Sequence, residues 1–128
     1  MLKTWLAEFP WESVVALNAQ LCAAKQALHK PTSDGDDAAH LLWEKLYSQE
    51  MGLDEAVEIC RRCHRIAPFC FFNGNTFAAI ARTCIVSASN LSSTDQYLLK
   101  NIVGHIVAGT ATPEEEQQFR TLLQKIEG

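Results

Sequence analysis

Apolar residues recur along the chain at intervals of three and four, the spacing that places them on one face of an α-helix. The clearest stripe lies between Pro10 and His29 and consists of Val14, Leu17, Leu21, Ala24 and Leu28. No stretch alternates with period two for long enough to predict a strand, and Pro68 interrupts the one β-like patch, 66–72. We therefore predict an all-α fold that opens with a helix over residues 10–29.

Glycine, proline and acidic residues delimit the next two helices. After a loop at 30–35, Asp36 or Asp37 can cap a helix that is predicted to end near Gln49. A third helix is predicted over 54–66, because Pro68 disfavours helical backbone at the residue before it.

The fourth helix follows a turn at 73–74 and is predicted to extend to about Ile85, with Asn73 or Asn75 as its cap.

The last two helices have sequence signatures at their starts. Ser93 and Gln96 form a capping-box pattern for a helix that continues to about Ile106. Thr112 as N-cap, Pro113 at the first helical position and acids in the first turn begin the final helix. We predict five to six helices, packed as antiparallel hairpins because the connections are short.

Composition and charge limit the classes of protein to which this chain can belong. A chain of 128 residues suits a single domain, 1–128, and a net charge of −4 argues against a nucleic-acid binder, which needs a basic surface. Glu8 and Pro10 interrupt any signal-peptide core, and the longest charge-free run is too short to span a bilayer. With five cysteines and no secretory signal, we expect reduced thiols in a cytoplasmic protein that binds no membrane.

The predicted helix starts near residues 37, 75 and 113 are 38 residues apart, which suggests hairpins stacked in register. The segment 53–68, LDEAVEICRRCHRIAP, resembles the second helix of a tetratricopeptide repeat. In that family this helix opens with an apolar residue and Asp-Glu-Ala, carries a small residue two turns later and closes at a proline. Here Cys63 is the small residue and Pro68 the closing proline.

The resemblance is best over 37–68 and weaker over 71–108. Trp43 and Tyr47 stand where the first helix of the repeat carries a leucine and a tyrosine. Glu44 departs from the small residue that the family prefers. His40 likewise replaces a tryptophan, and the link at 87–93 is longer than a standard repeat allows.

The resemblance implies a function in protein–protein interaction. Stacked hairpins form a concave surface, lined by the first helices, that holds an extended peptide or a partner helix. The residues expected on that surface are Leu41, Lys45, Ser48, Phe72, Asn75, Ala79 and Arg82. Lys45 and Arg82 could pair with an acidic peptide or a C-terminal carboxylate. We therefore expect a non-enzymatic adaptor or chaperone-like module without a cofactor.

A cysteine–histidine group provides the main alternative, a small zinc-stabilised regulatory domain. Cys60 and His64 are one helical turn apart, Cys63 is adjacent, and Cys70 could complete a tetrahedral site after the turn. The same helical residues fall on the apolar stripe, where cysteine acts as a small hydrophobe. The sequence leaves both interpretations open.

A third alternative is a homodimeric helical bundle with a structural role, suggested by Gly104 within an apolar helix. No serine or cysteine has a histidine at a recognisable catalytic spacing, so we do not predict an enzyme.

Overall fold

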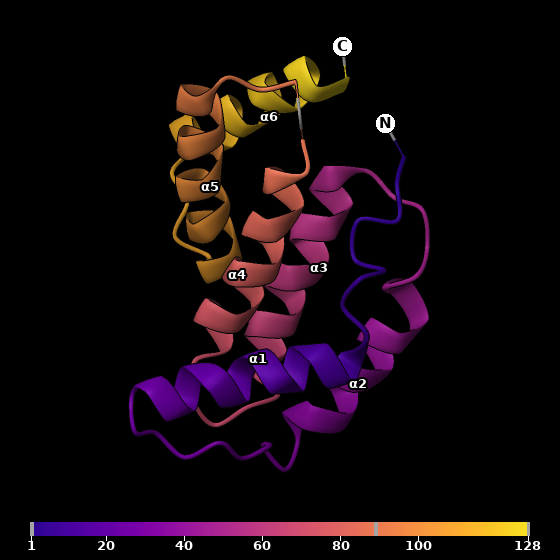
Figure 1. Ribbon diagram of the computed structural model, residues 1–128, viewed down its shortest axis with the longest axis vertical. Coiled ribbons are helices and arrows are strands. Elements are labelled where there is room, and N and C mark those ends of the chain that lie inside the picture. Colours follow the sequence, from indigo (N-terminus) through magenta and orange to yellow (C-terminus); the bar gives the residue numbers. More distant parts are fainter. Residues whose placement is uncertain (1, 89, 128) are drawn as a thin grey trace.

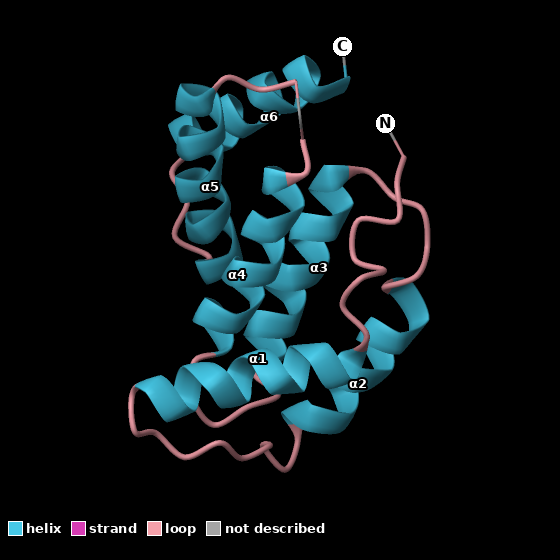
Figure 2. Cartoon of the chain, viewed as in Figure 1, coloured by secondary structure: helices cyan, strands magenta, loops and turns pink. Residues whose placement is uncertain are grey.

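The computed structural model describes residues 2–88 and 90–127 and confirms an all-α fold (Figure 1). Its helices are α1 (Trp11–Ala24), α2 (Gly35–Leu46), α3 (Leu53–Ile66), α4 (Asn73–Val86), α5 (Ser93–Ala108) and α6 (Pro113–Glu127). Figure 2 shows that loops account for the rest of the described chain. Extended backbone pairing in these residues consists of two isolated bridges, Lys3 with Met51 and Pro31 with Phe69.

Helices α3, α4 and α5 lie side by side, and consecutive members run in opposite directions, as the short connections predict (Figure 1). Helices α1 and α2 cover one end of this group, and α6 crosses the other end (Figure 1). Fully buried apolar side chains fill the space between the three central helices, among them Phe77, Ile80, Leu99 and Ile102.

The N-terminal segment 2–9, which we call the strap, packs onto the helices and contains a turn at residues 5–8. Its Trp5 and Leu6 are buried, and the strap is joined to the loop before α3 by the Lys3–Met51 bridge. At its other end, the buried Trp43 donates its indole N–H to the Phe9 carbonyl at 2.7 Å. The strap therefore closes the side of the molecule where α2, α3 and α4 meet.

The prediction that the first helix continues to His29 is wrong, because α1 ends at Ala24. Gln26 then adopts a left-handed backbone with φ of 55°, and Leu28 is 62% exposed. The buried stripe of the helix is also displaced from the predicted one and consists of Trp11, Val14, Asn18 and Cys22.

Asn18 is the cause of this displacement. Its side chain is fully buried and donates to the Phe71 carbonyl at 2.8 Å and to the Thr76 hydroxyl at 3.1 Å. Its amide oxygen accepts hydrogen bonds from Cys22 Sγ at 3.6 Å and from His29 Nδ1 at 2.8 Å. A buried amide must be paired in this way, so the polar residue turns its face of α1 inward and draws the chain back after Ala24.

The predicted start of α6 is confirmed by the hydrogen bonds of its cap. Glu115 donates its N–H to the Thr112 hydroxyl, and the Glu115 carboxylate accepts from the Thr112 N–H, each at 3.1 Å. This reciprocal pair confirms Thr112 as the cap of α6. For α5 the cap lies one residue earlier than predicted, because the Ser92 hydroxyl accepts from the Asp95 N–H.

Two other predicted caps are wrong. Helix α2 already begins at Gly35, and the Thr32 hydroxyl, in place of Asp36 or Asp37, accepts the Gly35 N–H at 3.1 Å. Helix α4 follows Phe72, which has a left-handed backbone, and neither Asn73 nor Asn75 caps it.

The junction between α2 and α3 requires a glycine at position 35. The Thr32 hydroxyl donates to the Ala67 carbonyl at 2.7 Å, so the start of α2 lies against the last carbonyls of α3. A Cβ at position 35 would overlap the Ala67 carbonyl oxygen and lie 2.6 Å from that of Ile66. Backbone atoms cannot move aside as a side-chain end can.

We predict that Gly35→Ala lowers the free energy of unfolding by about 1–3 kcal/mol, because α2 must move off the end of α3. Urea unfolding measures this change. Gly52→Ala is the matched control: it also removes a glycine at a helix start, but its Cβ would meet only the side-chain ends of Asp54 and Glu55. Equal effects of the two substitutions would contradict the close approach at Gly35.

Candidate functional site

The structure does not gather the seven residues predicted for partner binding into one hollow. Leu41 is 74% exposed on α2, and Lys45 and Ser48 are exposed near the end of that helix. The other four, Phe72, Asn75, Ala79 and Arg82, lie at the start of α4 and along it. None of the seven lines any of the hollows described below.

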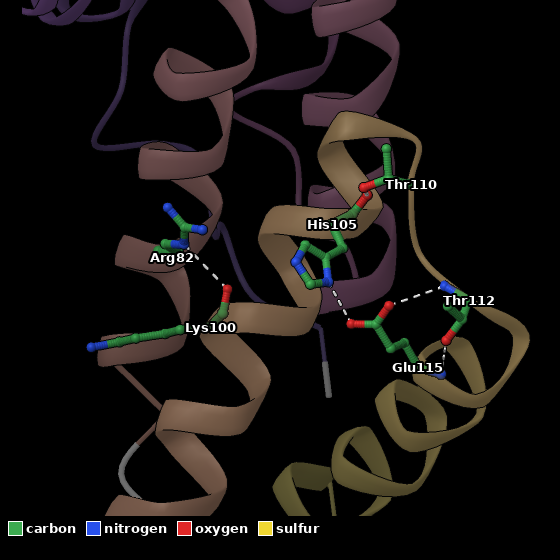
Figure 3. A network of polar contacts seen from close by, with 6 residues as sticks. All are labelled: Arg82, Lys100, His105, Thr110, Thr112 and Glu115. Carbon is green, nitrogen blue, oxygen red and sulfur yellow. Dashed lines mark hydrogen bonds and ion pairs between the residues drawn. The ribbon is translucent and has the colours of Figure 1, made fainter.

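Arg82 has a structural contact that its sequence position did not indicate. Its Nε donates to the Lys100 carbonyl of α5 at 3.2 Å (Figure 3). The guanidinium also covers Gly104, since a Cβ at that position would overlap Nη2. Gly104 thus allows Arg82 to cross from α4 to α5 within one chain.

The proposed zinc ligands are not brought together either. Cys60 and Cys63 are buried, Cys70 is exposed, and His64 donates from Nδ1 to the Val107 carbonyl at 2.7 Å. Among the side chains of residues 2–88 and 90–126, no three from Cys, His, Asp or Glu form a group that could hold a metal ion.

Burial also keeps these thiols protonated. Desolvation raises the pKa of Cys60 well above its ordinary value and that of Cys63 to about 12. Nucleophilic attack needs the thiolate, so Cys60 and Cys63 pack as protonated, small core side chains at neutral pH.

The hollow of greatest interest lies between α3, the turn after α5, and α6. Its apolar side chains are Val57, Ile106 and Phe119, from three different helices. Charged and backbone groups complete a volume of about 430 Å³, lined also by Asp54, Glu58, Arg61, Gly109, Ala111, Glu116 and Arg120. We call this hollow the α3–α6 groove.

Further hollows continue the α3–α6 groove along α3. One of about 290 Å³ is formed by Arg61, His64 and Arg65 with residues 107–109. A second, of about 440 Å³, is lined by Glu58, Arg61, Arg62, Arg65 and Ile66. Because these hollows share Arg61, the outer face of α3 has recesses along most of its length.

Two more hollows complete the set. One of about 310 Å³ separates α3 from Leu46 of α2 and borders the α3–α6 groove at Asp54 and Glu58. The other, of about 440 Å³, lies between the strap and residues 83–87 of α4.

The charges on α3 follow a simple order. Acids occupy its first half, Asp54, Glu55 and Glu58, and arginines occupy its second half, Arg61, Arg62 and Arg65. This order complements the helix dipole, which is positive at the start of a helix and negative at its end.

Glu58 and Arg61 form a two-point ion pair, with Arg61 Nε and Nη2 donating at 2.8 and 2.6 Å. These hydrogen bonds lower the pKa of Glu58 and raise that of Arg61. The ion pairs between described residues do not include Arg62 or Arg65, and both side chains are exposed. The end of the α3 face therefore carries two exposed arginines outside the ion pairs of the described residues, although the whole chain is acidic.

A polar clamp positions the α6 wall of the groove (Figure 3). His105 of α5 donates from Nδ1 to Glu115 Oε2 at 2.5 Å, while the other oxygen of Glu115 accepts the Thr112 N–H. The sequence did not suggest this pair, because a lone histidine and a run of three glutamates give no spacing signal for a tertiary contact.

Comparisons with known proteins found no match to a protein-family model, a curated protein or a solved structure. The resemblance to tetratricopeptide repeats therefore stays a prediction. Among the described helices, none has the length and apolar character needed to cross a membrane.

We predict that Glu115→Gln lowers the melting midpoint at neutral pH, because the clamp loses its charge. The Thr112 N–H and His105 lower the pKa of Glu115 in the folded protein. A lowered pKa stabilises the fold above the ordinary glutamate value, about 4.3, and this stabilisation is lost as the pH falls through the folded-state value. The difference between wild type and variant should therefore shrink from pH 7 toward pH 3.

Thermal unfolding at several pH values tests this prediction. Glu114→Gln is the matched control, since Glu114 makes no hydrogen bond or ion pair with another described residue. A pH-independent difference, or the same effect from Glu114→Gln, would contradict the role of the clamp.

We also predict that one thiol in five reacts rapidly with an aromatic disulfide reagent in the native protein. Cys70 is exposed, whereas Cys22, Cys60, Cys63 and Cys84 are buried. Cys70→Ser should abolish the fast phase, and the other four thiols should react only after unfolding. If a second thiol reacted rapidly in the native protein, at least one of these four cysteines would be exposed to solvent, which would contradict their burial.

Proposed function

We propose that this chain is a non-enzymatic module for protein–protein interaction and that the α3–α6 groove binds its partner. One observation carries the proposal: the groove combines the apolar side chains Val57, Ile106 and Phe119 with a rim of charged groups of both signs. An apolar centre within a charged or polar rim is the usual composition of a protein interface. The groove is also rich in arginine, which is enriched at the sites that contribute most to binding.

The chemistry of the cysteines supports a binding role more than a catalytic one. Desolvation raises the pKa of both Cys63 and Cys84 to about 12, so neither offers a thiolate at neutral pH. The His105–Glu115 pair, which resembles part of a catalytic relay in composition, joins two helices, and its glutamate also completes the cap of α6. Holding the α6 wall of the groove in place is a sufficient structural explanation for the His105–Glu115 pair.

The surface predicted from the tetratricopeptide resemblance is a separate binding candidate. Lys45 and Arg82 belong to different helices, and Arg82 is engaged with the backbone of α5. A substitution in each surface can therefore distinguish them. The two remaining alternatives, a homodimer and a metal-stabilised domain, would be detected as a doubled mass or a bound metal in native mass spectrometry.

We predict that Ala111→Tyr weakens partner binding at least tenfold, equivalent to about 1.4 kcal/mol, by filling the groove. Ala111 lies in the turn before α6 and is half-buried, so a larger side chain there enters the groove without entering the core. Calorimetric titration with a purified partner, first identified by affinity capture, measures the change.

Two variants serve as controls in the same titration. Ala38→Tyr adds the same bulk to an exposed position of α2 and should leave the affinity unchanged. Lys45→Glu with Arg82→Glu tests the other surface. If this pair abolishes binding while Ala111→Tyr has no effect, the partner binds outside the α3–α6 groove and the proposal is wrong in its choice of site.

A further inference from the structure

The charge order along α3 specifies what kind of partner segment the groove accepts. We infer that the partner contributes an amphipathic helix that lies antiparallel to α3, with acidic residues in its first half and basic residues in its second. This inference rests on the proposed function and adds to it the chemistry and the direction of the bound segment.

The separation of charge on α3 excludes a ligand of one sign. A uniformly acidic segment would pair with Arg61, Arg62 and Arg65 but would meet Asp54, Glu55 and Glu116 at the other end. A uniformly basic segment would pair with the acids at the start of α3 but would meet the arginines at its end. A segment with both charges, separated along its length, can satisfy the two ends at once.

Direction follows from the same order. An antiparallel helix places its start beside the end of α3, where Arg62 and Arg65 are exposed and have no ion-pair partner among the described residues. Its end then lies beside Asp54 and Glu55. Acids near the start and bases near the end are also the arrangement that each helix dipole favours. A parallel helix with this arrangement would place like charges together.

The length of the charged face sets the length of the partner. Residues 54–65 of α3 span about 17 Å at 1.5 Å per residue. A partner helix of about 12–14 residues, or three to four turns, covers this distance. Its apolar stripe would contact Ile106, which is half-buried and lies beside the buried Val57 and Phe119 at the floor of the groove.

A second copy of α3 satisfies the charge rule but lacks the apolar stripe. The outward side chains of α3 are Asp54, Glu55, Arg62 and Arg65, and none of the large apolar residues that are exposed lies on this helix. Two α3 faces brought together would leave the apolar side chains of both grooves without a contact. The inference therefore favours a different chain over self-association through α3.

Two stapled helical peptides of 14 residues, with identical composition and an identical leucine stripe, test the inference. One carries glutamates in its first half and lysines in its second, and the other carries the reverse order. The staple gives both peptides the same helix content, so that a difference in folding before binding cannot produce a preference. Amide shifts of the isotope-labelled protein measure affinity at low ionic strength.

We expect the glutamate-first peptide to bind about tenfold more tightly, since several exposed ion pairs of modest strength contribute together. The preference should decline in 0.5 M salt, where the Debye length falls below 5 Å. A nitroxide at the start of this peptide should broaden the amide signals of Arg62 and Arg65 and spare those of Asp54 and Glu55.

A charge-reversed variant gives the sharpest control. Asp54→Lys and Glu55→Lys combined with Arg62→Glu and Arg65→Glu should reverse the preference between the two peptides. A charge-matched variant at exposed positions elsewhere, Glu12→Lys and Asp37→Lys combined with Lys25→Glu and Lys45→Glu, should preserve it. If the reversed variant fails to fold, the nitroxide measurement on the wild-type protein still reports the direction.

Equal affinities, a lysine-first preference, broadening at the start of α3, or no shift on α3 with either peptide would overturn the inference. These results differ from a failure of the proposed function. If Ala111→Tyr still weakens binding of the purified partner while the two peptides bind with equal affinity, the groove is an interface but does not select an antiparallel helix.

Discussion

The buried side chain of Asn18 joins three separate parts of the fold. Its amide joins α1 to the carbonyl of Phe71, to Thr76 at the start of α4, and to His29 in the loop before α2. An unpaired buried amide costs about 1–3 kcal/mol, so these segments are stable only together. The position of α4 beside α3 depends on this junction, because it fixes the loop between them.

That junction also explains which parts of the fold could be predicted. The α3 boundaries and the Thr112 cap depend on residues within one turn of each other, and the sequence patterns predicted both. The end of α1 and the start of α4 depend on contacts between residues more than 50 positions apart, and both predictions failed. Periodicity assigned Leu28 to a helix face because it cannot detect that Asn18 requires a partner.

The candidate site was less predictable than the fold. Its components were visible singly: the acids and arginines of α3 are evident in the sequence, as are Phe119 and the acids after Pro113. The sequence did not show that these residues lie together, because α6 lies about 60 residues from α3 and is positioned by the His105–Glu115 contact. The residue pattern favoured Lys45 and Arg82 instead, and the contact of Arg82 with α5 could not be anticipated without knowing that Gly104 faces it.

The tryptophans are unevenly distributed over the fold, which affects what the intrinsic fluorescence of the protein reports. All three tryptophans are buried, Trp11 and Trp43 where α1 meets α2 and Trp5 in the strap, where its carbonyl accepts from Cys84 Sγ of α4. Trp11 stacks on His40 and Phe69 with ring centroids 5.1 and 6.0 Å apart, whereas the α3–α6 groove contains no indole. Intrinsic emission therefore reports the integrity of the strap and of the α1–α2 junction. A single tryptophan placed in a bound segment would therefore add its own emission, while the emission of the three native tryptophans, which lie away from the groove, would stay the same.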